Sequence, residues 1–341
     1  MNLSDRKKKI LQIVIDDYIS SAQPVSSKSI SDNYLKDISS ATVRNELAAL
    51  EELGYLSQMH TSSGRVPSAS AYKLYVEELM DKKDLSLTDI EYIRRTLHDN
   101  MNNTEYLVKT AVKLISDLTN YTSLAISSFN KKDKIESVKI IRLKDDIGLM
   151  LVVTENNFYK DTVINLPQNL SDDGLNNSIR LLSNRFYGKT IEEIISLKTD
   201  IEREFKAYKE FFSSVIETLK TIIEKKAANV LLEGENKIFN QPEYENIDNV
   251  KNFLSVINDK EKIASMLETK TDTGIEVTIS IDNDKTQNLP ANCSLISAKY
   301  SYSGKNLGTY GVIGPMRMDY NKVISVLENL GQVLENIIKE K

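Results

Sequence analysis

Apolar residues recur at helical spacing through the first fifty residues and divide them into three short helices. The pattern predicts helices over residues 3–21, 27–34 and 41–53, separated by polar segments. Ser40 is suited to cap the third helix, and Gly54 is suited to the position that follows its last turn. Short helices joined by polar turns indicate a compact helical subdomain at the start of the chain.

A strand pattern and a polar turn follow the third helix. YLSQM (55–59) alternates as a strand does, TSSG (61–64) suits a turn, and RVP (65–67) suits a returning strand before Ser68 begins another helix. Three helices followed by a hairpin, all within about 65 residues, is the order of a winged helix-turn-helix, a fold that binds DNA.

The third helix carries the chemistry that fits this interpretation. Val43, Leu47 and Leu50 form its apolar stripe, so Thr42, Arg44 and Asn45 point away from the core in the first two turns. A recognition helix reads bases with these early turns, where Arg can bind guanine and Asn adenine. A plain solvated helix face is the alternative for Arg44 and Asn45, and the winged-helix order favours DNA.

The hairpin and the helix starts supply candidate phosphate contacts. Free backbone N–H groups and hydroxyls at a helix start suit phosphate oxygens, and Arg65 beside the polar turn suits a wing that grips the DNA backbone. The predicted DNA-binding residues are Ser27, Lys28, Ser39, Ser40, Thr42, Arg44, Asn45, His60, Thr61, Ser62, Ser63 and Arg65.

Beyond residue 83 the pattern changes twice. Helices to about residue 120, opened by a capping box at 88–91, precede four strand-like runs that end near residue 165. Helical spacing then returns, and a capping box at 199–202 opens a run to about residue 226. Strands resume at GIEVTISI, CSLISAKY and NLGTYGVIGP, and Asp319 caps a final helix expected to pack on the sheet rather than to form a coiled coil.

Strands on both sides of a helical block predict an α+β domain with an insertion. The expected divisions are a winged helix-turn-helix at 1–83, linker helices and the first part of the α+β domain at 84–165, a mainly helical insertion at 166–226, and the second part at 227–341. The long apolar stripe of the insertion packs either on its own domain or on a second copy of the chain. Its residues are Phe205, Tyr208, Phe212, Val215 and Leu219.

Composition excludes several function classes. The chain has 341 residues, a net charge of −5, one cysteine and two histidines. Cys293 fits the pattern of a small buried thiol, and His98 fits that of a solvated residue at a helix end. The chain therefore lacks the residues that a zinc site or Cys–His catalysis requires. No phosphate-binding glycine motif, export signal or membrane-length apolar run occurs, which predicts a cytoplasmic protein without cofactors.

Bulk charge argues against a DNA-binding protein. The first 80 residues contain nine Lys and Arg against ten Asp and Glu, a net of −1. Only an uneven distribution over one face makes DNA binding compatible with this balance. A small effector bound by the α+β domain stays open as an alternative, and catalysis with His60 as a general base lacks a partner in the sequence.

Five segments in order resemble the HrcA family of heat-inducible transcription repressors. They are PVSSKSI, SSATVRNELAALEELGYL, HTSSGRVPSASAYKLYV, NVLLEGENKIFNQPEY and GTYGVIGPMRMDY, and together they span nearly the whole chain. The resemblance implies a homodimer with an N-terminal winged helix and a GAF-like domain interrupted by a dimerising insertion. It also implies binding to the CIRCE inverted repeat upstream of the groE and dnaK operons, with activity modulated by the chaperonin GroEL.

Overall fold

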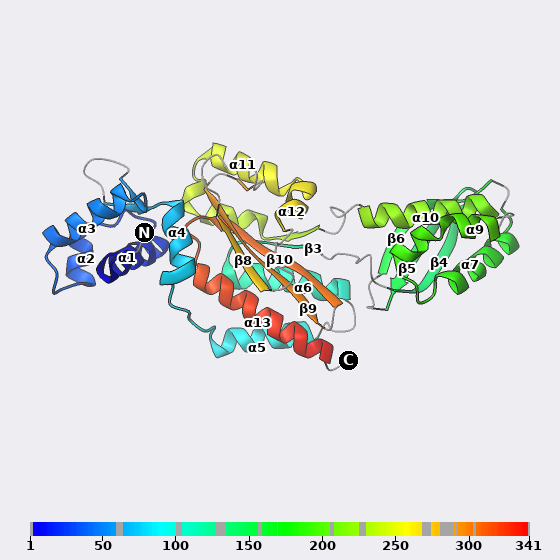
Figure 1. The fold of residues 1–341 in the computed structure, drawn as a ribbon, viewed down its shortest axis with the longest axis horizontal. Helices are drawn as coiled ribbons and strands as arrows, with labels where there is room; N and C mark the ends of the chain where they lie inside the picture. The colour runs from blue at the N-terminus through cyan, green and yellow to red at the C-terminus, as the bar shows by residue number, and fades with distance from the viewer. Residues whose placement is uncertain are drawn as a thin grey trace.

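The computed structural model of the chain has three units: a winged helix, a central domain and an inserted unit (Figure 1). It describes residues 3–58, 64–99, 104–126, 134–155, 159–168, 170–204, 208–224, 230–267, 274–279, 289–290, 292–302 and 305–339. Five of the residues singled out above lie outside these ranges, namely His60, Thr61, Ser62, Ser63 and Phe205. No described helix is long and apolar enough to span a bilayer.

The predicted winged helix is confirmed in its order of elements. Helices α1 (Asp5–Ser21), α2 (Ser27–Asn33) and α3 (Ser40–Glu52) precede strands β1 (Leu56–Ser57) and β2 (Val66–Pro67), which pair antiparallel. The predicted cap of α3 is wrong by one residue. Ser39, with extended backbone angles, caps the helix by accepting a hydrogen bond from the Thr42 N–H, and Ser40 is already helical.

Helices α4 to α6 lead from the winged helix into the central domain. Ser68 caps α4 (Ala69–Leu74), as predicted, and a single π-helical turn, η1 (Tyr75–Leu79), continues it. Ser86 caps α5 (Leu87–His98) by accepting from the Asp89 N–H, so the predicted capping box at 88–91 does not start this helix. Helix α6 (Thr104–Thr119) then leads into the first strand of the central sheet.

The central sheet is antiparallel and has five strands. These are β3 (Thr122–Ile126), β7 (Val230–Glu233), β8 (Gly274–Ile279), β9 (Cys293–Tyr302) and β10 (Lys305–Pro315), in the order β7-β3-β10-β9-β8. Side chains alternate between its two faces, so that Ala125, Ala298 and Val312 join one buried cluster and Leu124, Leu295 and Ile313 another. This alternation leaves both faces apolar and requires helices on each side.

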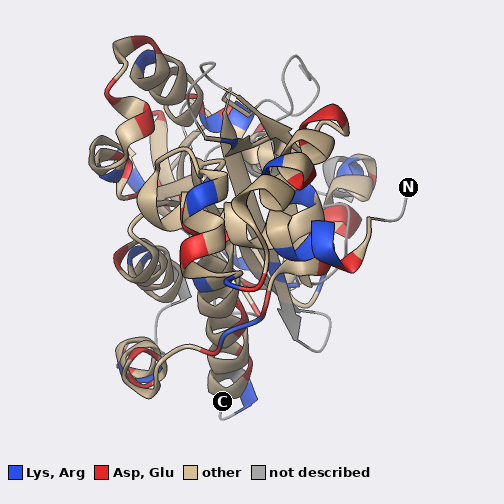
Figure 2. Cartoon of the chain, turned by 90° about the vertical axis from the view of Figure 1, so that its left-hand side faces the viewer, with Lys and Arg blue, Asp and Glu red and all other residues tan. Residues whose placement is uncertain are grey.

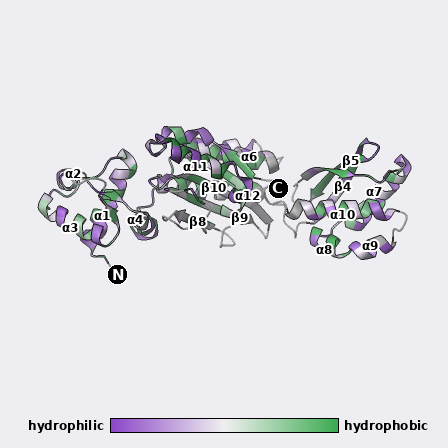
Figure 3. Ribbon diagram, turned by 90° about the horizontal axis from the view of Figure 1, so that it is seen from above, coloured by the Kyte–Doolittle hydropathy of each residue, from purple (hydrophilic) through white to green (hydrophobic). Residues whose placement is uncertain are grey.

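Helices cover both faces of this sheet. On one side lie α5, α6 and α13 (Tyr320–Lys339), whose apolar stripe is buried as the sequence predicted. The other side is covered by η4 (Glu235–Asn240), η5 (Pro242–Tyr244), α11 (Ile247–Ile257) and α12 (Lys260–Met266). Figure 1 shows this layering, with α11 and α12 above the strands and α13 and α5 below them, and Figure 3 shows hydrophobic stretches along the strands from above. An α+β architecture is therefore confirmed.

The inserted unit departs from β3 and returns to β7. These strands are neighbours, and Ile126 and Val230 are register partners, so the two ends of the insertion lie side by side. Between them stand β4 (Ile135–Lys144), β5 (Ile147–Thr154), β6 (Tyr159–Asn165), α7 (Asp172–Phe186), α8 (Ile191–Ser196), α9 (Lys198–Glu204) and α10 (Lys209–Glu224). An insertion between adjacent strand ends leaves the host sheet intact.

The predicted start of the insertion at residue 166 is wrong. Strands β4, β5 and β6 form a separate three-stranded sheet and do not pair with the central one. Their inward residues share a buried cluster with α7, α8 and α10. The insertion therefore begins before Ile135, because a strand belongs to the sheet whose hydrogen bonds it completes. Short alternating runs look alike in sequence whichever sheet they join.

The amphipathic stripe proposed for dimerisation is also reassigned. The run after residue 198 forms two helices, α9 and α10, rather than one. Phe212, Val215 and Leu219 are fully buried in the inserted unit's own cluster, and Tyr208 packs against it. These described residues cannot form a dimer contact without exposing that core, so the alternative of packing within the same unit is the correct one.

Cys293 and His98 take the predicted structural roles. Cys293 is buried, and its Sγ lies 3.2 Å from the Tyr244 hydroxyl oxygen. Burial raises the pKa of the Cys293 thiol to about 12, so the thiol is protonated and unreactive near neutral pH. His98 is exposed at the last position of α5.

Candidate nucleic-acid interface

Helix α3 presents the first two turns of its outer face to solvent. Val43, Leu47 and Leu50 are buried against α1 and α2, with exposures of 0%, 4% and 0%. Arg44 and Asn45 are exposed on the opposite side. The structure therefore places both predicted base-reading side chains where a major groove can reach them.

The start of α3 is held by hydroxyl contacts. Ser39 Oγ accepts from the Thr42 N–H at 3.1 Å and lies 2.9 Å from Thr42 Oγ1. Ser40 Oγ lies 3.2 Å from Ser27 Oγ, which ties α3 to the start of α2. Lys28, next to Ser27, is exposed. The candidates Ser27, Lys28, Ser39, Ser40 and Thr42 are thus brought together at the junction of two helix starts, where anions are favoured.

Two of the three acidic residues of α3, Glu46 and Glu51, are neutralised from other elements. Glu46 accepts ion pairs from Lys7 Nζ at 2.8 Å and from Arg6 Nη1 at 3.8 Å, both from the first turn of α1. Glu51 pairs with Arg65 Nη2 at 2.8 Å. No carboxylate among the described residues pairs with Arg44. The net charge of −1 therefore hides an uneven distribution, in which two carboxylates of the helix are compensated and its outer cation is left for a polyanion.

Figure 2 looks onto the winged-helix end and shows ribbon segments of both charge signs there. Positive and negative residues are interspersed, so a uniformly basic surface is not what this fold offers to DNA. Recognition must then depend on a few well-placed side chains more than on bulk attraction. The sequence did not indicate these ion pairs. Arg6 and Lys7 pair with a residue about forty positions away, and Glu51 pairs with a residue on the other side of a turn.

Arg65 takes a different role from the one expected of a wing residue. Its side chain is 17% exposed, and its guanidinium pairs with Glu51 at the end of α3. Its backbone forms both hydrogen bonds of a bridge with Val25, at 2.9 Å and 2.8 Å. The prediction that Arg65 grips the phosphate backbone is therefore replaced by a structural one: Arg65 holds the returning strand against the recognition helix.

Gly64 makes this bridge possible. A Cβ atom at this position would lie 2.5 Å from the carbonyl carbon and oxygen of Val25 and 2.7 Å from the carbonyl carbon of Pro24. Backbone atoms cannot yield as a flexible side chain can, so only glycine allows the returning strand to approach the α1–α2 connection. The glycine of the predicted turn is thus a packing requirement.

Among the described residues, no group of three or more His, Cys, Asp or Glu side chains is placed to hold a metal ion. The arrangement instead offers hydrogen-bond donors on one short helix, a pair of antiparallel strands beside it, and ion pairs that compensate two of the helix's carboxylates. These are the parts of a winged helix-turn-helix DNA-binding protein.

Comparison with known proteins identifies the family. Residues 2–80 match the winged helix-turn-helix DNA-binding model of the HrcA transcription repressor, and residues 105–324 match the model of the HrcA C-terminal domain. The chain belongs to the HrcA family.

Curated relatives match over almost their entire length. The heat-inducible transcription repressor HrcA of Clostridium acetobutylicum is 36% identical over 99% of both chains, and that of Ruminiclostridium cellulolyticum is 35% identical over 99% of both. A crystal structure of a hypothetical protein is similar in fold, with a TM-score of 0.65 and 22% identity, over 98% of this chain and 100% of that one. The three-unit architecture is therefore shared with a solved structure.

Proposed function

We propose that this protein is a heat-inducible transcription repressor that binds an inverted-repeat operator as a homodimer. The observation that carries the proposal is the exposed outer face of α3, with Arg44 and Asn45 free of the core and two of the helix's three carboxylates compensated by ion pairs. Membership of the HrcA family supports the repressor role, and the relatives bear that name. The family resemblance extends the proposal to the CIRCE operator and the groE and dnaK operons.

A two-fold operator calls for a two-fold protein, so the repressor needs a self-complementary surface. The open face of the β4-β5-β6 sheet fits this need. Ile141, Leu143 and Val163 point away from the unit's helices and are 59%, 54% and 60% exposed. Ile141 and Val163 both pair in register with Leu149. Ile141, Leu149 and Val163 therefore form one apolar row across the sheet. Exposed apolar patches of this kind mark interaction surfaces.

Charges at the borders of this face favour a second copy as its occupant. Lys139 on β4 and Asp161 on β6 are both exposed and flank Leu151 as its register partners. A two-fold axis parallel to the strands sets Lys139 of one copy over Asp161 of the other. The open sheet face thus replaces the buried α10 stripe as the proposed dimer contact.

Introducing lysine at both Ile141 and Val163 is expected to weaken the dimer. Two like charges on each face would oppose each other across the two-fold contact, and the dimer dissociation constant should rise at least about tenfold. Analytical ultracentrifugation of the full chain measures it, with Leu87→Lys on α5, where the side chain is 85% exposed, as the control. An unchanged dissociation constant in the double variant would place the dimer contact elsewhere.

Release on heating follows from the same dimer. A single winged helix binds a half-site weakly, and linking two in one dimer raises the effective concentration of the second. Loosening the dimer or partly unfolding the chain therefore releases DNA. Binding of the native chain by GroEL, or its refolding by GroEL, would restore repression while unfolded proteins are scarce.

Footprinting of the full chain on its own chaperone promoters tests the function directly. Protection of an inverted repeat is expected at growth temperature, with loss after heating and faster recovery when GroEL is added. Random DNA of equal length serves as the control. Equal protection of all sequences, or none on these promoters, contradicts the proposed function.

A further inference from the structure

Arg317 lies in the turn between β10 and α13 and is nearly buried, with 11% of its side chain exposed. Its Nε donates to Glu243 Oε1 at 2.5 Å, and its Nη2 donates to Glu243 Oε2 at 3.3 Å. The same Nη2 donates to Gln241 Oε1 at 3.1 Å. Its Nη1 donates to the Ile19 carbonyl oxygen at 2.8 Å. One guanidinium therefore joins segments that are far apart in the sequence.

The Ile19 carbonyl belongs to the last turn of α1, in the winged helix. Carbonyls of a last turn have no partner within the helix and carry the negative end of its dipole, so a cation is well placed there. Glu243 and Gln241 belong to η5 and the residue before it, in the central domain. The fork thus bridges the DNA-binding unit and the domain that carries the insertion.

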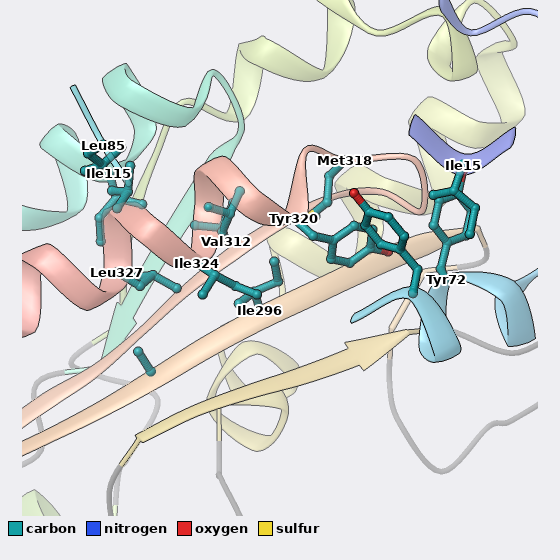
Figure 4. Packing of buried hydrophobic residues seen from close by; sticks show 14 of the residues in the cluster. Ile15, Tyr72, Leu85, Ile115, Ile296, Val312, Met318, Tyr320, Ile324 and Leu327 are labelled. Atoms are coloured by element: carbon teal, nitrogen blue, oxygen red, sulfur yellow. The ribbon is translucent and has the colours of Figure 1, made fainter. Parts of the chain in front are cut away.

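Tyrosine rings from the two units also meet at this junction, in tilted and edge contacts. The Tyr72 and Tyr75 rings from α4 and η1 lie 5.8 Å and 6.5 Å from the Tyr320 ring of α13. Figure 4 shows Tyr72 beside Tyr320 and Met318 in this buried cluster. Tyr75 also donates to Asp16 Oδ1 of α1 at 2.6 Å. Apolar contact is not directional, whereas a planar fork with four acceptor atoms on three residues specifies an angle.

We infer that Arg317 is a positioning residue, which holds the winged helix at one orientation on the central domain and so sets the half-site separation that the dimer accepts. The inference rests on the proposed function, because only a dimer on an inverted repeat has a separation to set. Two recognition helices must meet two grooves at a fixed distance, so a rigid junction makes binding depend on the spacer.

The experiment uses the full chain with Arg317→Gln and Arg317→Lys, and with Arg94→Gln as a control. Arg94 on α5 is 63% exposed and forms only a loose pair with Glu91 at 3.9 Å. Each protein is titrated on the operator with its natural spacer, on operators with the spacer changed by one to five base pairs, and on a single half-site.

Wild-type protein and Arg94→Gln should bind the natural spacer best and lose affinity steeply as the spacer changes. Arg317→Gln should bind the natural operator about tenfold more weakly, with a flattened spacer profile and unchanged affinity for the single half-site. Arg317→Lys keeps the charge but not the fork, and should fall between the two.

A steep profile in Arg317→Gln overturns the inference, and so does an equal loss on the half-site and the operator, which marks general destabilisation. Glu243→Gln serves as the second variant should Arg317→Gln fail to fold. This substitution weakens the fork while leaving the Ile19 contact. A spacer profile as steep as that of the wild type in Glu243→Gln would also contradict the inference. Failure of the wild-type protein to prefer any inverted repeat would instead refute the proposed function.

Discussion

Replacing Arg44 with alanine is expected to weaken operator binding by about 1–3 kcal/mol and to relax base preference at one position of each half-site. The side chain is exposed on the first turns of α3 and pairs with no described carboxylate, so its removal leaves the fold untouched. A residue that reads a base loses discrimination as well as affinity. A residue that only touches phosphate loses affinity equally on all sequences.

Titration on the operator, on point-substituted operators and on random DNA separates these outcomes. Arg94→Ala provides a control of the same residue type, with its side chain 63% exposed on a helix of the central domain. Thermal unfolding of both variants should match that of the wild-type protein. If Arg44→Ala bound every sequence as the wild type does, α3 would not be the reading helix.

Replacing Phe212 with alanine is expected to lower the free energy of unfolding of the inserted unit by about 3–5 kcal/mol. The ring is fully buried and lies 5.6 Å from the Phe211 ring in an edge contact, so its removal leaves a large cavity. Calorimetry of the full chain should show an earlier transition for the inserted unit. The winged helix should retain its affinity for a single half-site.

The control for this variant is Phe239→Ala, because Phe239 is 63% exposed on η4 and should cost little. The comparison also decides between two interpretations of the α10 stripe. A dimer contact at Phe212 predicts a monomeric variant with an unchanged melting temperature. That result would reinstate α10 as the dimerising surface and contradict the packing described here.

Local features of the winged helix were predictable because they depend on neighbouring residues. Helix spacing, turn residues and hydroxyl caps act within a few positions, so the three helices and the hairpin followed from the sequence, with the cap of α3 misplaced by one residue. The outward position of Arg44 and Asn45 followed from the stripe of Val43, Leu47 and Leu50. The family motifs then indicated what such a surface binds.

Pairings between distant segments were not predictable in the same way. A strand pattern does not say which sheet it joins, so β4 to β6 were assigned to the central sheet when they form their own. An apolar helix stripe does not say whether the unit itself or a second copy covers it, and in α10 the unit does. Arg65 looked like a free cation beside a polar turn, but the partner that occupies it lies on α3.

Periodicity and motif order alone establish an HrcA-type chain with a winged helix at one end and an interrupted α+β domain behind it. Tertiary structure decides which strands pair in each sheet, which apolar faces are covered and which charges are compensated. The physical reason is that sheets, buried clusters and ion pairs join residues from different segments, as Arg317 and Glu243, 74 positions apart, show, and nothing local encodes their meeting.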